Sequence, residues 1–296
     1  MRIDPASFLA TREVADLITR ACEARKPFAL IRLGDGEALA LAQGSVRTLA
    51  QVASYAFLRE AGVIVPDLRA RDLVAAAVRL ADVVGVAARR DPPEFAPLTE
   101  EAFAYFNLQP RLLCDCCVNY ALQGEGLLVP LLAGRRLFLV NRRWPRWAEA
   151  LESVYGLTVG GGAAVDHFGE IEKALAAAGR ERFDVALVAA GVPATWLSVA
   201  LARQNRCVAL DLGRLADLMS SQLCRADVDG RPISTSPRQH IYCSSQGGPA
   251  GGVSSRRRVL HGAGSRGEGQ RQVSRGATFQ GKREGVIWIR SSGRRW

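Results

Sequence analysis

Two carboxylates near the start of the chain stand at a spacing that suits a divalent cation. Asp35 and Glu37 alternate with Gly34 and Gly36 in the run Gly-Asp-Gly-Glu. Carboxylate oxygens are hard ligands, and two of them two residues apart can hold a cation together with a phosphate-bearing substrate. The glycines lack a Cβ atom, so the backbone can turn sharply and approach a ligand closely. The pattern therefore indicates a metal or phosphate site.

The flanking residues predict that this run lies at the end of a strand. Phe28–Leu33 is apolar except for Arg32, and the helix-forming residues 38–43 follow the run. In an open parallel sheet, ligands bind at the carboxyl ends of the strands. A purely structural interpretation stays open, in which Asp35 caps the helix and Glu37 lies in its first turn, where the helix dipole favours acids.

The hexapeptide Arg32 to Glu37 resembles the Arg-x-Gly-Asp-Gly-Glu signature of the GT-D-fold glycosyltransferases. Shorter stretches extend the resemblance over roughly residues 10 to 220: Val65-Pro66-Asp67-Leu68, Asn119-Tyr120, Ala189 to Ala194, and Asp211-Leu212-Gly213. It implies a Rossmann-like domain that transfers a sugar from a nucleotide-sugar donor. Asp35 and Glu37 would then be the site for a divalent cation (manganese or magnesium) and the donor diphosphate. One departure is Arg214, which stands where the family pattern would place a histidine.

Four more residues are candidates for the same site. Arg32 could donate to phosphate, or it could form a salt bridge with Asp35 or a neighbouring loop acid. The turn Gly191-Val192-Pro193 would let backbone N–H groups face a nucleotide. Asp211 could bond a ribose hydroxyl, act as a base toward an acceptor hydroxyl, or simply cap a helix. Asn119 is a candidate for contact with the sugar or the base.

Alternating strand and helix patterns predict an α/β fold, specifically a Rossmann-like three-layer sandwich with a mostly parallel sheet. A single helical stretch is expected over residues 48–61, and residues 137–140 are expected to form a strand buried on both faces. Gly160-Gly161-Gly162 lacks the dinucleotide-binding spacing and is interpreted as a flexible turn. Residues 185–202 carry no charge. Gly191 and Pro193 interrupt them, however, which favours strand, turn and helix over a membrane span.

Several other kinds of site are not supported by the sequence. The chain has no G-x-x-x-x-G-K-[ST] loop and no G-x-S-x-G elbow, and His167 is interpreted as a surface or capping residue. The seven cysteines lack the paired C-x-x-C or histidine spacings that zinc would require, which favours free thiols over a zinc framework. Because the amino-terminal residues also lack an apolar signal region, we expect a cytoplasmic protein.

The basic character of the chain resides in its last residues. Residues 221–296 hold 14 Lys+Arg and 4 Asp+Glu, which leaves 25 of each among residues 1–220 and places the whole net charge of +10 in the tail. The tail is rich in glycine, serine and arginine, so we expect it to be disordered and to bind nucleic acid only weakly. The abrupt change of composition would also suit an out-of-frame extension of a GC-rich gene.

These patterns together predict a glycosyltransferase-like domain over residues 1–220 and a disordered basic tail over residues 221–296. The acceptor would be a hydroxyl of a glycan or a protein. Two alternatives stay open. One is a non-catalytic Rossmann-like nucleotide- or sugar-binding module that acts through partners, and the other is an RNA-binding protein that acts through its tail.

Overall fold

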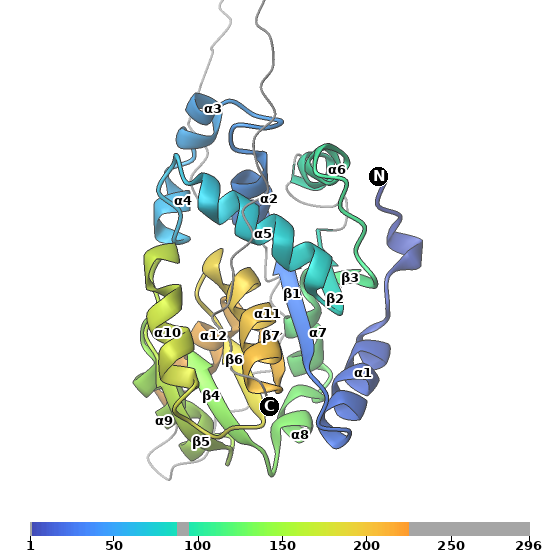
Figure 1. Cartoon of the computed structure of the whole chain (residues 1–296). Helices are drawn as coiled ribbons and strands as arrows, with labels where there is room; N and C mark the ends of the chain where they lie inside the picture. The colour runs from blue at the N-terminus through green and yellow to red at the C-terminus, as the bar shows by residue number, and fades with distance from the viewer. Residues whose placement is uncertain (1, 88–94, 225–296) are drawn as a thin grey trace, which may run out of the picture. The chain divides into compact units, whose positions relative to one another are not determined.

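Seven parallel strands form a single sheet in the computed structural model, which describes residues 2–87 and 95–224 (Figure 1). Their order across the sheet is β3-β2-β1-β7-β6-β4-β5. The strands are β1 (Phe28–Leu33), β2 (Val83–Val86), β3 (Leu113–Asp115), β4 (Arg136–Val140), β5 (Thr158–Ala163), β6 (Val185–Val188) and β7 (Val208–Asp211). Every described pairing between strands is parallel, so the predicted α/β class is confirmed.

Helices connect the strands and cover both faces of the sheet, as parallel connections require. The α-helices are α1 (Thr11–Glu23), α2 (Asp35–Ala42), α3 (Leu49–Ala53), α4 (Phe57–Glu60), α5 (Leu68–Leu80), α6 (Phe95–Tyr105), α7 (Val118–Gly124), α8 (Leu128–Leu132), α9 (Trp144–Ser153), α10 (Ile171–Ala178), α11 (Pro193–Asn205) and α12 (Leu215–Ser221). Three short 3-10 helices accompany them: η1 (Pro5–Ser7), η2 (Phe168–Glu170) and η3 (Gln222–Cys224).

The direction in which the chain builds the sheet reverses between β1 and β7. The chain first lays down β1, β2 and β3 toward one edge, then crosses to the other side and returns through β6 to β7, which pairs with β1. Such a reversal is a topological switch point, and ligands of open α/β sheets bind outside the carboxyl ends of the strands that flank it. A ligand is therefore expected to bind beside the residues that end β1 and β7.

Side-chain alternation along β1 divides the core into two layers. Ala29, Ile31 and Leu33 are buried on the face covered by α5, α10 and α11, which lie in front of the sheet in Figure 1. Phe28 and Leu30 are buried on the opposite face, in the layer that includes residues of α1, α7, α9 and α12. A strand whose two faces are both covered must be apolar throughout, which explains the run that encodes β1.

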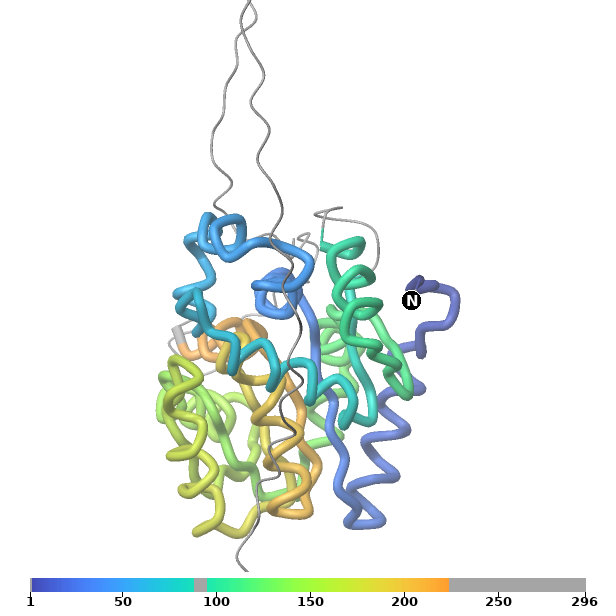
Figure 2. Tube along the Cα trace, turned by 45° about the horizontal axis from the view of Figure 1, so that its top comes forward, coloured from blue at the N-terminus to red at the C-terminus, as the bar shows by residue number. Residues whose placement is uncertain are grey.

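A third cluster of apolar residues lies beyond the carboxyl end of β1. Helices α2, α3 and α4 gather there with α6, although some fifty residues separate α2 from α6 (Figure 2). Ala38, Leu39, Leu58 and Leu98 are buried in this cluster. The segment that begins with Asp35 is thus packed into the fold on its apolar side rather than exposed as a free loop.

The single helix expected over residues 48–61 is wrong, because the chain forms α3 and α4 there instead. Thr48 caps α3 through its side-chain oxygen, which accepts a hydrogen bond from the N–H of Gln51 at 3.2 Å. The chain leaves the helical path at Tyr55, and Gly62, with a φ of +89°, follows the end of α4. Two short helices allow the segment to fold back over α2.

The flexible turn expected at Gly160-Gly161-Gly162 is also wrong, since all three glycines belong to β5. The strand pairs with β4 and carries an irregularity that passes over Gly160. A Cβ atom at Gly162 would lie 2.6 Å from the ring of Trp144 and 2.7 Å from the carbonyl oxygen of Leu139. Gly162 therefore lacks room for a side chain because the indole packs directly against this edge strand.

Other predictions from the sequence are confirmed. Residues 185–202 form β6, a turn and most of α11, and residues 137–140 of β4 are fully buried. No helix among the described residues is both long and apolar enough to cross a bilayer. Of residues 221–296, which were expected to be disordered, residues 221–224 end α12 and form η3, and the others lie outside the described residues.

Candidate functional site

The side chain of Arg32 connects the strand ends at the switch point. Arg32 is the one charged residue of β1, and its side chain is only 15% exposed, so burial demands partners for its donors. Nε donates to the carbonyl oxygen of Asp211 at 3.0 Å and Nη2 to Asp211 Oδ1 at 3.2 Å. Nη1 donates to the carbonyl oxygen of Cys116 at 3.0 Å and to Asn119 Oδ1 at 3.4 Å. One side chain thus joins the ends of β1, β3 and β7.

The salt bridge considered for Arg32 therefore forms with Asp211 rather than with Asp35. Asp211 is 2% exposed, and it also accepts hydrogen bonds from the backbone N–H groups of Arg32 and Gly213. Burial raises the pKa of the Asp211 carboxyl, and the guanidinium of Arg32 opposes that shift. Burial likewise lowers the pKa of Arg32, but the Asp211 and Glu37 carboxylates more than offset this, so the guanidinium stays charged.

Asp35 and Glu37 open α2 directly after β1, as predicted. Glu37 Oε2 accepts a hydrogen bond from the N–H of Gly34 at 2.9 Å, and Asp35 Oδ1 accepts one from the N–H of Gly36 at 2.8 Å. The structural interpretation is thus correct for Glu37, which lies in the first turn of α2, and wrong for Asp35, because Gly34 is the N-cap residue and Asp35 bonds only the next backbone N–H. Each carboxylate uses one oxygen in these bonds, and both side chains are only half-buried. Capping and ligand binding are therefore compatible.

Negative charge accumulates around Glu37. Burial, together with the carboxylates of Asp211 and Asp35, raises the pKa of Glu37 to about 8. A divalent cation would relieve this repulsion, and carboxylate oxygens are the ligands that magnesium and manganese prefer. Among the described residues, however, Asp35, Glu37 and Asp211 do not converge as a tight three-ligand cluster. The donor set thus fits a hard cation that bound phosphate oxygens help to hold.

The glycines near these acids allow close approach between elements. Gly36 is buried, and a Cβ atom there would lie 3.0 Å from Val192 Cγ2. Gly191 is exposed with a φ of +63°, and its Cβ atom would lie 2.5 Å from the carbonyl oxygen of Ala61. The N–H of Val192 already donates to that oxygen at 2.9 Å. The expectation that this N–H faces a ligand is therefore wrong, whereas ligand contact at Gly34 and at Gly191 itself stays a prediction.

Asn119 is fully buried and serves the framework of the site. Its Nδ2 donates to the carbonyl oxygen of Leu212 at 2.7 Å, while its Oδ1 accepts from Arg32. These bonds tie α7 to the end of β7 and fix the guanidinium of Arg32 from a second side. Contact between Asn119 and a sugar or base stays a prediction, and the observed role is to position Arg32.

Two residues outside the predicted set also matter. Cys116 supplies a carbonyl acceptor to Arg32, and Asp115 bonds the N–H of Cys117 at 2.8 Å. The sequence gives a partial signal for such partners, because an arginine within a buried strand needs acceptors at the ends of neighbouring strands. His167 is an exposed cap whose Nδ1 accepts from Gly169, as predicted, and Arg214 is exposed before α12.

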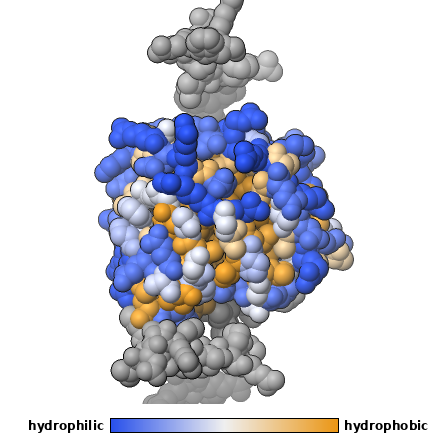
Figure 3. All heavy atoms as spheres, turned by 90° about the horizontal axis from the view of Figure 1, so that it is seen from below, coloured by the Kyte–Doolittle hydropathy of each residue, from blue (hydrophilic) through white to orange (hydrophobic). Residues whose placement is uncertain are grey.

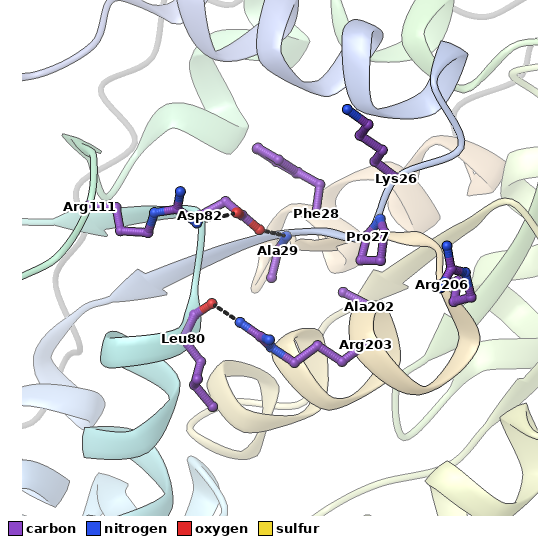
Figure 4. A pocket seen from close by; sticks show the side chains of 10 residues that line it. All are labelled: Lys26, Pro27, Phe28, Ala29, Leu80, Asp82, Arg111, Ala202, Arg203 and Arg206. Atoms are coloured by element: carbon purple, nitrogen blue, oxygen red, sulfur yellow. Dashed lines mark hydrogen bonds and ion pairs between the residues drawn. The ribbon is translucent and has the colours of Figure 1, made fainter. Parts of the chain in front are cut away.

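The amino ends of the same strands surround a basic hollow. The cations Lys26, Arg111, Arg203 and Arg206 line a cavity of about 440 Å³ over Phe28 and Ala29 (Figure 4). Two of these cations have partners there, since Arg203 donates to the carbonyl oxygen of Leu80 and Arg111 pairs with Asp82. Seen from below, polar residues ring a central area of apolar ones (Figure 3). This hollow is at the opposite edge of the sheet from Asp35 and Glu37.

Comparison with known proteins agrees with this geometry. A family model described as a GT-D fold-like domain matches residues 9–219. A solved structure described as "The highly conserved domain of unknown function 1792 has a distinct glycosyltransferase fold" is similar, with a TM-score of 0.50 and 12% sequence identity. The similarity covers 74% of this chain and 82% of that chain, and at this identity it shows the fold alone. No curated protein matches the chain. The chain belongs to the GT-D fold-like domain family.

Proposed function

We propose that this protein is a metal-dependent glycosyltransferase that moves a sugar from a nucleotide-sugar donor to an acceptor hydroxyl. The observation that carries the proposal is the gathering of Asp35, Glu37 and the Arg32–Asp211 pair at the switch point of a GT-D-like domain. Ligands of open α/β sheets bind at this place. The acceptor, on a glycan or a protein, belongs to the proposal as well.

Asp35 and Glu37 are the residues that would hold a divalent cation, manganese or magnesium. When bound, such a cation supplies Lewis-acid stabilisation of the charge that develops on a nucleoside diphosphate leaving group. Glu37 would lose its proton when such an ion binds, since burial and the neighbouring carboxylates favour the protonated acid. The remaining oxygens of the two carboxylates face no described hydrogen-bond donor.

Arg32 and Asp211 act in this proposal mainly on the shape and charge of the site. Arg32 places positive charge where a donor phosphate would lie, and Asp211 fixes its planar fork by accepting one hydrogen bond at its carbonyl oxygen and one at Oδ1. Asp211 is buried and its oxygens are engaged, so a role as base toward the acceptor would require movement around Gly213. The contacts of Asp211 directly support one role, which is to position Arg32.

The test begins with purified full-length protein and a panel of nucleotide sugars, with and without manganese. A donor present at 100 times its dissociation constant adds about 2.7 kcal/mol to the stability, which appears as a rise in melting temperature. Donor turnover is then followed by release of the nucleoside diphosphate. Stabilisation without turnover, for any acceptor tried, would favour the alternative of a non-catalytic binding module.

Substitutions locate the activity. Asp35→Asn and Glu37→Gln should each lower metal-dependent turnover by at least about 100-fold, because the charge stabilisation supplied by a metal amounts to several kcal/mol. Glu13→Gln is the matched control, since Glu13 accepts the N–H of Ala10 at the start of α1 just as Glu37 accepts that of Gly34 at the start of α2. Parental turnover in both site variants would place the chemistry elsewhere. Arg32→Lys should weaken donor affinity while preserving charge.

A further inference from the structure

Two adjacent cysteines and an aspartate follow the end of β3 beside Arg32. The potential ligand atoms of Asp115, Cys116 and Cys117 all lie within 4.8 Å of one another, and the three residues form the only such group among the described residues. Both cysteines are in the thiol form. Cys116 is 6% exposed, whereas Cys117 and Asp115 are half-buried, so the group is accessible from the side of Cys117.

The distance between the sulfurs suits a tetrahedral metal. The Sγ atoms of Cys116 and Cys117 lie 3.9 Å apart. Two thiolates bound to zinc at about 2.3 Å with a tetrahedral angle between them lie about 3.8 Å apart. The pair therefore needs almost no rearrangement to chelate one ion.

We infer that Asp115, Cys116 and Cys117 form a site for one thiophilic divalent cation of the zinc class. Two thiolates and a carboxylate prefer zinc over magnesium or manganese, so this site would take a different metal from the one proposed at Asp35 and Glu37. Three protein ligands leave a fourth position for water or another ligand. Binding of each ion displaces two thiol protons.

The neighbourhood of the group contains a positive charge and excludes the nearest other cysteine. The guanidinium of Arg32 donates to the carbonyl oxygen of Cys116, which places a fixed positive charge beside the group. Cys114 is fully buried in the apolar core, where burial raises its pKa to about 12. Strand alternation places it on the face of β3 opposite to Asp115, so it is not one of the proposed ligands.

A bound ion would also be connected to the switch point. The carbonyl group of Cys116 accepts from Arg32, and Cys117 caps α7, which carries Asn119. Asn119 in turn bonds both Arg32 and the carbonyl oxygen of Leu212. An ion at this group would therefore hold the acceptors that orient Arg32.

Cobalt titration of the full-length protein under reducing conditions tests the inference. Cobalt bound by thiolates gives a charge-transfer band in the near ultraviolet, and we expect this band to reach its limit at one ion per group. Cys116→Ser and Cys117→Ser should each reduce it by half or more, and Asp115→Asn should weaken the affinity at least tenfold. Cys22→Ser is the matched control, because Cys22 is a half-buried thiol on α1. An unchanged band in both cysteine variants would overturn the inference.

Two further measurements keep the test decisive. Should the serine variants fail to fold, alkylation of the parental protein gives the answer. Zinc should then slow the modification of Cys117 at least tenfold and leave that of Cys22 unchanged, and equal rates with and without zinc would refute the site. Asp35→Asn should keep the cobalt band, so a failure of the proposed glycosyl transfer and a failure of this site give different results.

Discussion

The two edges of the sheet use charge in opposite ways. At the carboxyl edge, Asp211 is buried against Arg32, and the carboxylates of Asp35 and Glu37 stand nearby at the start of α2. At the amino edge, arginines and a lysine surround an open hollow, and the Arg111–Asp82 pair there joins an exposed arginine to a half-buried aspartate. Both sets of charges lie at the ends of the same strands. The difference shows that the burial of an ion pair, rather than the sign of the charges, decides whether the stability of an edge depends on that pair.

The largest expected effect is at the buried pair. Arg32→Met should lower the free energy of unfolding by about 3–5 kcal/mol, because it leaves the Asp211 carboxylate buried without its cation. Arg111→Met at the amino edge breaks a pair in which the arginine side chain is 72% exposed. That change should cost no more than about 1 kcal/mol. Chemical denaturation of both variants measures the two losses of unfolding free energy. Similar losses at the two edges would contradict the comparison.

A smaller effect separates two glycines with similar backbones. Gly191, at the carboxyl edge, has a φ of +63°, and Gly134, before β4 at the amino edge, has a φ of +70°. A Cβ atom would meet the carbonyl oxygen of Ala61 at Gly191, whereas nothing lies within 4 Å at Gly134. Gly191→Ala should therefore destabilise the protein by about 1–3 kcal/mol more than Gly134→Ala does.

Thermal or chemical unfolding of the two alanine variants provides this measurement. The strain of a left-handed backbone is common to both and cancels in the difference. Equal destabilisation would mean that the turn at Gly191 moves away from Ala61 without cost, and the carboxyl edge would then be less tightly packed than its contacts indicate.

The acids of the carboxyl edge should make stability depend on pH. Because the folded state raises the pKa of Glu37 to about 8, folded Glu37 keeps a proton that the unfolded chain has already lost. The free energy of unfolding should then fall as pH rises from about 4.5 to 8. One proton sets a limit of about 1.4 kcal/mol per pH unit, and the half-buried position of Glu37 should keep the slope well below it.

Unfolding measured against pH in the presence of a chelator tests this. Glu37→Gln should show a shallower decline than the parental protein, while Glu13→Gln, which removes a cap from α1, should follow the parental curve. Added manganese should reverse part of the decline if Asp35 and Glu37 bind it. If the free energy of unfolding falls with pH at the same slope in all three proteins, the acids of the carboxyl edge do not differ electrostatically from the rest of the molecule.

The smallest effect is expected for the cations of the amino edge. Arg206 has no described ion pair and caps α11 with a φ of +52°. Arg206→Asn keeps a residue that tolerates this backbone, so stability should change by no more than about 0.5 kcal/mol. Arg25→Asn, at a φ of +50° just outside the hollow, is the control. A loss above about 2 kcal/mol for Arg206→Asn alone would show that the hollow supports the fold.

Local sequence patterns were sufficient to predict the strands and the position of Asp35 and Glu37. Five apolar residues around Arg32 predicted β1, and the Gly-Asp-Gly-Glu run at its end predicted both a helix start and a candidate site. Alternation of strand and helix predicted the parallel sheet, because parallel strands require crossover helices. The glycine run in β5 was misjudged, since Gly162 packs against an indole ring from α9, a contact that no local pattern reports.

The sequence by itself thus determined the order of elements and the chemical types at the strand ends. Only the tertiary structure decided which of them meet. Arg32 and Asp211 are 179 residues apart, and they pair because the crossover of the chain places β7 beside β1. The same packing brings Cys116 and Asn119 to the guanidinium. Partner choice depends on strand order, which follows from how all the buried faces pack together and is not encoded near any one residue.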